Sequence, residues 1–181
     1  MEKSYGLTYP DYCKYIYEVY LDAKEHADKI GLNVLFGQEL KLDCTGGNDY
    51  LVYGVAYEQM LEYGDMMSWT PSKLNEASKS DGFLFYQAHP FRDHMKIVPP
   101  KDLYGVEVFN GCHEDNFIDN IANMWAEKFG LRKIAGSDCH ELSTVGRAGV
   151  KFTSEIRDNS DIVQALMNNN YYLVENVLYT V

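Results

Sequence analysis

Short apolar runs and helical patterns alternate along this chain, and that order restricts the fold more than any other feature of the sequence. A helix is expected from about Tyr12 to Ile30, with Pro10 near its first turn and Gly31 just past its end. Further helices are expected near 70–80, 115–129 and 160–167, and strands at 32–36, 51–55, 83–87, 106–109, 133–135, 150–152 and 171–174. This order predicts an α/β fold of mainly parallel units, either an open doubly wound sheet or a barrel. Because no glycine-rich nucleotide-binding loop is present, we expect the barrel.

The length and hydropathy predict one domain over residues 1–181. A chain of 181 residues that is 46% hydrophobic can bury a single substantial core. No run of about 18 apolar residues suggests a membrane span, and the N-terminus lacks the basic start and apolar stretch of a signal peptide. We therefore expect a cytoplasmic protein that does not insert into a membrane.

Charge and cysteine content exclude some functions. A net charge of −11 would repel a phosphate backbone, so no stable nucleic-acid complex is expected, whereas a small phosphorylated substrate remains compatible. The four cysteines contain no Cys-x-x-Cys pair, which argues against a structural zinc knot and against a disulfide framework. We expect all four to be free thiols: Cys13, Cys44, Cys112 and Cys139.

Side chains of metal-binding types come directly after several expected strands. These residues are Glu39, His89, Asn110, Asp138 and His140. In an α/β barrel the C-terminal ends of the strands meet at one rim, where active sites are built. Carboxylates and imidazoles suit zinc, manganese or iron, so the pattern predicts a metal site at that rim.

Each of these residues also has a purely structural interpretation. His89, between Ala88 and Pro90, could be a loop histidine held by backbone hydrogen bonds. Asp138 could cap a helix, with His140 in the loop that follows. Against this second alternative, alternate residues that leave a strand point the same way, which favours a shared role for the pair.

Four segments resemble successive motifs of the PHP (polymerase and histidinol phosphatase) family, in the same order and at similar spacing. They are Phe36-Gly37-Gln38-Glu39, Gln87-Ala88-His89-Pro90-Phe91-Arg92, Gly105-Val106-Glu107-Val108-Phe109-Asn110-Gly111 and Ala135-Gly136-Ser137-Asp138-Cys139-His140. The resemblance covers nearly the whole chain. It implies a distorted seven-stranded (β/α)7 TIM-like barrel that hydrolyses phosphoesters with two or three divalent metal ions, manganese, zinc or iron.

The resemblance also implies roles for individual residues. Glu39, His89, Asp138 and His140 match metal ligands of the family. Arg92 suits a phosphate clamp, because its planar guanidinium can engage two phosphoryl oxygens, and its alternative is a surface salt bridge. Arg147 is a second candidate for substrate binding.

The chain departs from the family pattern at two places. The family's opening His-x-His and Asp-His motifs do not occur before Glu39, where the only histidine is His26, expected on a helix. Where many members carry a histidine before a Leu-rich strand, Asp49 is the candidate replacement. We expect a barrel that is incomplete at its N-terminus, with impaired phosphoesterase activity and an open strand edge that favours homo-oligomers. The alternative is a degenerate, non-catalytic PHP-like domain that binds a metal or a partner.

Overall fold

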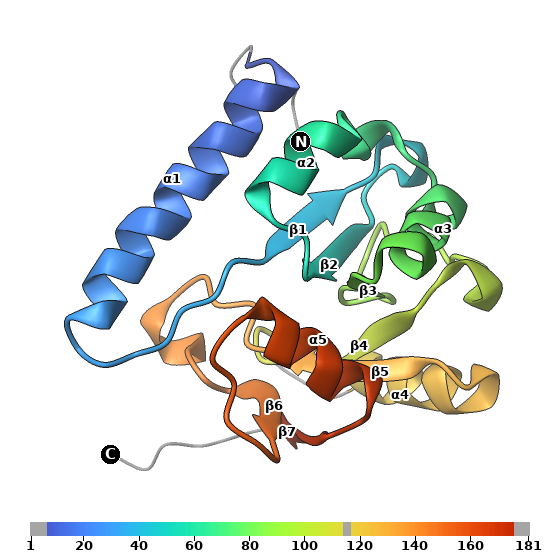
Figure 1. Cartoon of the computed structure of the whole chain (residues 1–181). Coiled ribbons are helices and arrows are strands. Elements are labelled where there is room, and N and C mark those ends of the chain that lie inside the picture. The colour runs from blue at the N-terminus through green and yellow to red at the C-terminus, as the bar shows by residue number, and fades with distance from the viewer. Residues whose placement is uncertain (1–6, 114–116, 176–181) are drawn as a thin grey trace.

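A five-stranded mixed sheet lies at the centre of the protein, with strand order β1-β2-β3-β4-β5 (Figure 1). The structure is a computed structural model that describes residues 7–113 and 117–175. Strands β1 to β3 pair antiparallel, whereas β3 to β5 pair parallel. The five strands are β1 (Gln38–Lys41), β2 (Asp49–Tyr53), β3 (Leu84–Gln87), β4 (Gly105–Asn110) and β5 (Arg132–Gly136).

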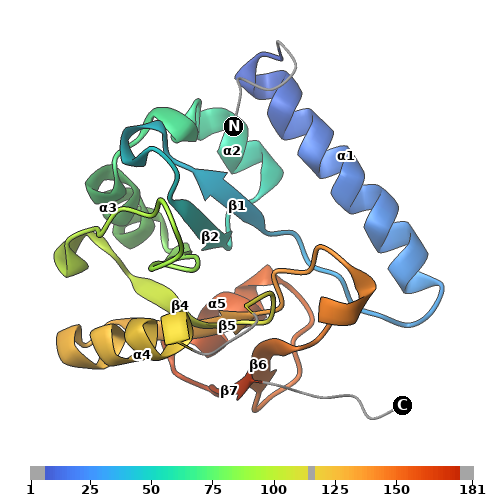
Figure 2. The ribbon, with the colours of Figure 1, turned by 180° about the vertical axis from the view of Figure 1, so that it is seen from behind.

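Helices surround this sheet, and a separate hairpin lies beside it. Strands β6 (Ala148–Phe152) and β7 (Tyr171–Glu175) form a two-stranded antiparallel sheet. Helix α1 runs along one side of the molecule, as Figures 1 and 2 show from opposite directions, and α4 lies beside β4 and β5. The α-helices are α1 (Tyr9–Asp28), α2 (Tyr57–Tyr63), α3 (Pro71–Asp81), α4 (Phe117–Phe129) and α5 (Asn159–Met167).

Local sequence signals account for the helix ends. The hydroxyl of Thr8 accepts a hydrogen bond from the backbone N–H of Asp11, whose carboxylate in turn accepts from the backbone N–H of Thr8, so α1 begins with a capping box. The hydroxyl of Thr70 caps α3 by accepting a hydrogen bond from the backbone N–H of Lys73, and Pro71 occupies the first turn of this helix. Gly82 ends α3 in the left-handed conformation that glycine adopts without steric cost.

The central strand β3 is buried on both faces, and the core is divided accordingly. Phe85 packs in a large cluster with Tyr50, whereas its neighbours Leu84 and Tyr86 pack in a second cluster with Ile134. Side chains alternate across a strand, so the two clusters lie on opposite faces of the sheet. The ends of β3 and β4 are thereby held between two packed layers.

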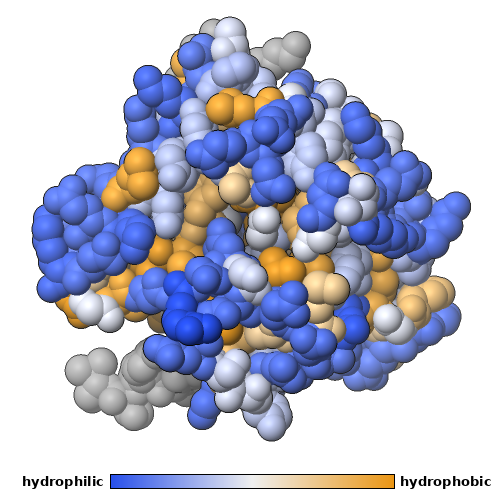
Figure 3. All heavy atoms as spheres, viewed as in Figure 1, coloured by the Kyte–Doolittle hydropathy of each residue, from blue (hydrophilic) through white to orange (hydrophobic). Residues whose placement is uncertain are grey.

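One face of the molecule is mainly polar. The face of the molecule in Figure 3 is dominated by hydrophilic residues, with hydrophobic side chains visible in patches between them. None of the helices in the described ranges is both long and apolar enough to cross a bilayer.

The α/β class is confirmed, whereas the expected strand pairing is wrong in part. The sheet is mixed rather than mainly parallel, and among the described residues it does not close into a barrel. Strands β1 and β2 are joined by a short connection through the 3₁₀ helix Asp43–Thr45, which is too short for the crossover that a parallel pair needs.

The expected strand at 32–36 is also wrong. The first strand begins at Gln38, so Glu39 lies within β1 instead of following a strand. The apolar side chain at Phe36 serves a contact with a helix instead of a strand: its ring packs against Tyr17 and Tyr20 of α1, at centroid distances of 5.4 and 5.2 Å. The helix expected from 160 begins at Asn159 and is capped by Asp158. Residues 115 and 116 of the expected helix 115–129 lie outside the described residues.

We predict that Gly105→Ala destabilises the protein by about 1–3 kcal/mol, the usual cost of overpacking. A Cβ at this position would lie 2.5 Å from the carbonyl oxygen of Arg132 and 2.5 Å from the ring of Tyr86. Chemical denaturation measures the free energy of unfolding. The matched control is Gly149→Ala, where an added Cβ meets nothing within 4 Å; equal effects of the two substitutions would contradict the close packing at Gly105.

Candidate metal centre

A pocket of about 200 Å³ brings together most of the residues that the sequence singled out. It is lined by Glu39, Lys41, Asp49, His89, Arg92, Asp138 and His140. Of the residues that the sequence singled out, Asn110 and Arg147 are not part of this lining. The pocket therefore collects side chains from strands β1 and β2 and from the segments that follow β3 and β5.

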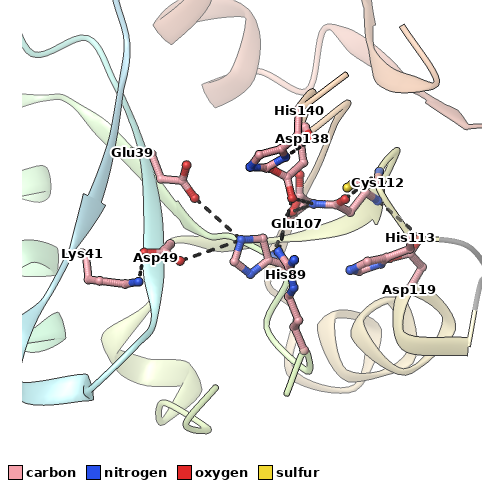
Figure 4. Close-up of polar contacts among 12 residues, drawn as sticks. Glu39, Lys41, Asp49, His89, Glu107, Cys112, His113, Asp119, Asp138 and His140 are labelled. Carbon is pink, nitrogen blue, oxygen red and sulfur yellow. Dashed lines mark hydrogen bonds and ion pairs between the residues drawn. The ribbon is translucent and has the colours of Figure 1, made fainter. Parts of the chain in front are cut away.

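The first group of ligand-type side chains consists of Glu39, Asp49 and His89, whose ligand atoms all lie within 4.8 Å of one another (Figure 4). Nε2 of His89 lies 3.7 Å from Oε1 of Glu39 and 3.9 Å from Oδ2 of Asp49. Glu39 pairs across the ladder with Leu51, two residues from Asp49, so both carboxylates project from the same face of the sheet. Burial raises the pKa of Asp49.

His89 is the most enclosed member of this group, with a side-chain exposure of 5%. It follows β3 and has a left-handed backbone, with φ of 29°. Its Nδ1 is buried without a hydrogen-bond partner in the described part of the chain. Burial acts to lower the pKa of His89, but the carboxylates of Glu39 and Glu107 outweigh it, so that pKa is raised above its ordinary value.

The second group consists of Cys112, Asp138 and His140, whose ligand atoms also lie within 4.8 Å of one another. Asp138 follows β5 with φ of 45°, and Nδ1 of His140 lies 3.5 Å from its Oδ1 and 2.9 Å from its carbonyl oxygen. The structure thus places Glu39, His89, Asp138 and His140 around one pocket, but it divides them between two groups.

Glu107 and Asn110 connect the two groups. The buried Glu107 carboxylate accepts hydrogen bonds through Oε2 from the backbone N–H of His89 at 2.9 Å and from Nδ2 of Asn110 at 3.0 Å. Nδ2 of Asn110 also donates to Oδ2 of Asp138 at 3.1 Å. Burial raises the pKa of Glu107 to about 7. The orientation of His89 and Asp138 therefore depends on a single buried acid.

A second pair of side chains, Asp119 and His113, holds the backbone of Asn110. The backbone N–H of Asn110 donates to Oδ2 of Asp119 at 3.3 Å, and Oδ1 of Asp119 lies 2.8 Å from Nδ1 of His113. The His113 side chain is only 11% exposed. Its partner Asp119 gave no sequence signal, since it lies in the first turn of α4, where acidic residues are common.

The two arginines differ in position. Nη1 of Arg92 lies 3.5 Å from Oδ2 of Asp138 at the pocket, and the Arg92 side chain is 46% exposed. Arg147 packs instead against the turn after β4, where a Cβ added to Gly111 would lie 2.9 Å from its Cβ. Lys41, which the sequence did not single out, adds a cation whose Nζ is 3.5 Å from Oδ1 of Asp49.

The arrangement fits divalent metal ions. Ligand atoms bound at about 2.0–2.2 Å to one tetrahedral ion are about 3.5 Å apart, close to the separations between His89 Nε2 and its two carboxylates. These separations exceed hydrogen-bond length, so the three side chains face a shared space without bonding to one another. Imidazole together with carboxylate is a donor set for zinc, manganese or iron.

Comparisons with known proteins point in the same direction. Residues 120–171 match the family model described as PHP-associated (PHP_C). The fold resembles PsfC from Pseudomonas syringae PB-5123, with a TM-score of 0.62 and 18% identity over 81% of this chain and 61% of that one. No curated protein matches the sequence.

A second solved structure has a similar fold. It is a two-domain protein from Bacteroides vulgatus ATCC 8482 containing a predicted PHP-like metal-dependent phosphoesterase, with a TM-score of 0.56 and 18% identity over 87% of this chain and 49% of that one. The chain thus spans about half to three-fifths of the length of these two structures. Together with the family-model match, this confirms the resemblance to the PHP family that the four motifs indicated.

We predict that Glu107→Ala destabilises the protein by at least about 2 kcal/mol. The substitution would leave the buried N–H of His89 without its acceptor and would remove one of the two acceptors of Asn110 Nδ2, and an unpaired buried donor costs about 1–3 kcal/mol. Thermal and chemical unfolding of metal-free protein would measure the loss. Glu18→Ala, on the exposed face of α1, is the control and should change stability by about 0.5 kcal/mol or less.

Proposed function

We propose that this chain is a metal-dependent phosphoesterase, or the part of one that carries much of its metal centre. The observation that carries the proposal is the pocket shared by Glu39, Asp49, His89, Asp138 and His140. The PHP-associated match supports the reaction class, because it is independent of the side-chain geometry.

We propose that the two ligand groups hold divalent ions: manganese, zinc or iron. Bound ions would lower the pKa of a water molecule and neutralise charge on phosphoryl oxygens. Glu39 and Asp49 would supply negative charge to the ions, and the buried His89 would supply a neutral nitrogen. His140, beside Asp138, would supply an imidazole nitrogen to the second group.

The substrate that suits this pocket is a small phosphorylated molecule. Two cations, Arg92 and Lys41, line the same pocket as the ligand groups and can bind phosphoryl oxygens. Their positive charge is local, because the whole chain carries −11 and would repel a nucleic-acid backbone. A bound phosphate would compete with Asp138 for the guanidinium of Arg92.

The barrel remains part of the proposal. The five-stranded sheet would correspond to a portion of the distorted PHP-type (β/α)7 barrel, with the pocket at its rim. The sequence contains no His-x-His before Glu39, so we expect weaker turnover from this chain than from a PHP enzyme with the full ligand set. The rival proposal is a metal-binding or partner-binding domain without catalysis.

We predict that protein purified without chelators contains zinc, manganese or iron and that His89→Ala lowers the bound metal at least tenfold. The His89 side chain is buried beside two carboxylates, so its loss removes the nitrogen ligand of the first group. Elemental analysis measures the metal, and turnover of a generic phosphoester measures activity. The control is His26→Ala, on the exposed face of α1.

The outcomes separate the two proposals. Metal lost from His89→Ala together with phosphoester turnover supports the enzyme. Metal bound by the wild-type protein without turnover of any phosphoester supports the binding domain. Equal metal contents in His89→Ala and in the wild type would contradict both.

We predict that Arg92→Ala weakens the inhibition of turnover by inorganic phosphate by about 10–100-fold, while the free energy of unfolding changes little. A hydrogen bond between charged groups contributes about 1.5–3 kcal/mol, and 1.4 kcal/mol corresponds to a factor of ten in affinity. Arg92→Lys should restore part of the affinity, because the charge remains without the planar fork. The control is Arg157→Ala, whose guanidinium pairs with Asp161 on the surface; an unchanged phosphate affinity in Arg92→Ala would exclude Arg92 from the substrate site.

A further inference from the structure

The second ligand group contains a sulfur atom that neither the sequence motifs nor the family resemblance pointed to. Sγ of Cys112 lies within 4.8 Å of the ligand atoms of Asp138 and His140. Figure 4 shows these three residues away from the Glu39 and Asp49 carboxylates. Thiolate, carboxylate and imidazole are three of the donor types that zinc and iron use in proteins.

The position of Cys112 is set by the backbone of the turn after β4. The N–H of Gly111 donates to the carbonyl oxygen of Gly136 at 2.9 Å, which joins this turn to the end of β5. A Cβ on Gly111 would lie 3.0 Å from Cα of Ser137, so only a residue without a side chain permits this approach. The close approach brings Cys112 beside the segment that carries Asp138.

Hydrogen bonds leave the required atoms available. The N–H of Cys112 is held by Oδ1 of Asn110 at 2.9 Å, whereas Nδ2 of the same amide donates to Oδ2 of Asp138. Arg92 also approaches Oδ2 of Asp138, so Oδ1 is the oxygen that faces His140. The network thus positions the thiol and one carboxylate oxygen without using either as a hydrogen-bond partner of the other.

The other three cysteines differ from Cys112 in their surroundings. Cys139, next to Asp138 and His140 in the sequence, is exposed and donates its S–H to the carbonyl oxygen of Glu141 at 3.3 Å. Cys44 donates to the carbonyl oxygen of Trp69, and Cys13 is a buried residue of α1. Of the four thiols, Cys112 alone belongs to a group of ligand-type side chains in the described residues.

We infer that Cys112 is a metal ligand and that, with Asp138 and His140, it forms a zinc- or iron-selective half of the centre. The inference rests on the proposed metal centre and adds a chemical difference between its two halves. Glu39, Asp49 and His89 offer two oxygens and one nitrogen, which suit manganese as well as zinc. The sulfur makes the other half softer and disfavours manganese and magnesium there.

Cobalt(II) provides the direct test, because it replaces zinc and shows a thiolate-to-metal charge-transfer absorption only when sulfur is bound. The wild-type protein, stripped of metal and titrated with cobalt(II), is expected to show this near-ultraviolet band. Cys112→Ser should abolish the band. The matched control is Cys139→Ser, which changes the cysteine between Asp138 and His140 in the sequence and should keep the band. X-ray absorption of the zinc-loaded protein should show a sulfur neighbour at about 2.3 Å.

Metal selectivity gives a second readout that does not depend on one variant. Cys112→Asp keeps an anionic ligand but replaces sulfur with oxygen, so the preference for zinc over manganese should fall at least about tenfold, while Cys139→Asp should leave it unchanged. Circular dichroism confirms that each variant is folded before titration. The Asp variant therefore tests the sulfur even if Cys112→Ser unfolds.

The outcomes distinguish this inference from the proposed function. Cobalt that binds the wild-type protein without a charge-transfer band would overturn the role of Cys112 and leave the metal centre standing. A band that survives in Cys112→Ser and disappears in Cys139→Ser would show that the sulfur ligand is Cys139 and would overturn the inference. Failure of the wild-type protein to bind cobalt, zinc or manganese would overturn the proposed function together with this inference.

Discussion

The arrangement of the pocket depends on one buried carboxylate, that of Glu107. A carboxylate removed from water is costly unless it is hydrogen-bonded, and Glu107 is compensated by the main chain of His89 and the side chain of Asn110. Because Asn110 also binds Asp138, this one acid connects the ends of β3, β4 and β5. Burial raises the pKa of Glu107, and the same low-dielectric surroundings strengthen its hydrogen bonds to His89 and Asn110.

Much of the fold could be predicted from local signals, and the failures have a common cause. The apolar runs of β3, β4 and β5 and the cap at Thr70 are features that neighbouring residues determine among themselves. Phe36 misled the prediction because its apolar character serves a contact with α1, and the real strand β1 is the more polar Gln38–Lys41. Pairing direction is decided by contacts between distant segments, which a local pattern does not encode.

The candidate site was predictable to a similar degree. Ligand-type residues placed just after strands gave His89, Asp138 and His140, since the chemistry of those side chains is visible in the sequence itself. Glu107 was missed because its role comes from burial, although an acid between Val106 and Val108 in an otherwise apolar strand was an available signal. The contribution of Lys41 depends on the ladder that places it opposite Asp49.

His89 and Asp138 share a feature with wider meaning: both have positive φ, at 29° and 45°. Side chains other than glycine adopt this region at a cost of about 1–3 kcal/mol, which the surrounding contacts must offset. Substitutions that relax these backbones would favour folding while removing a candidate ligand from the pocket. Selection for stability alone would therefore tend to erase this site, so its persistence in a lineage would itself record selection for binding.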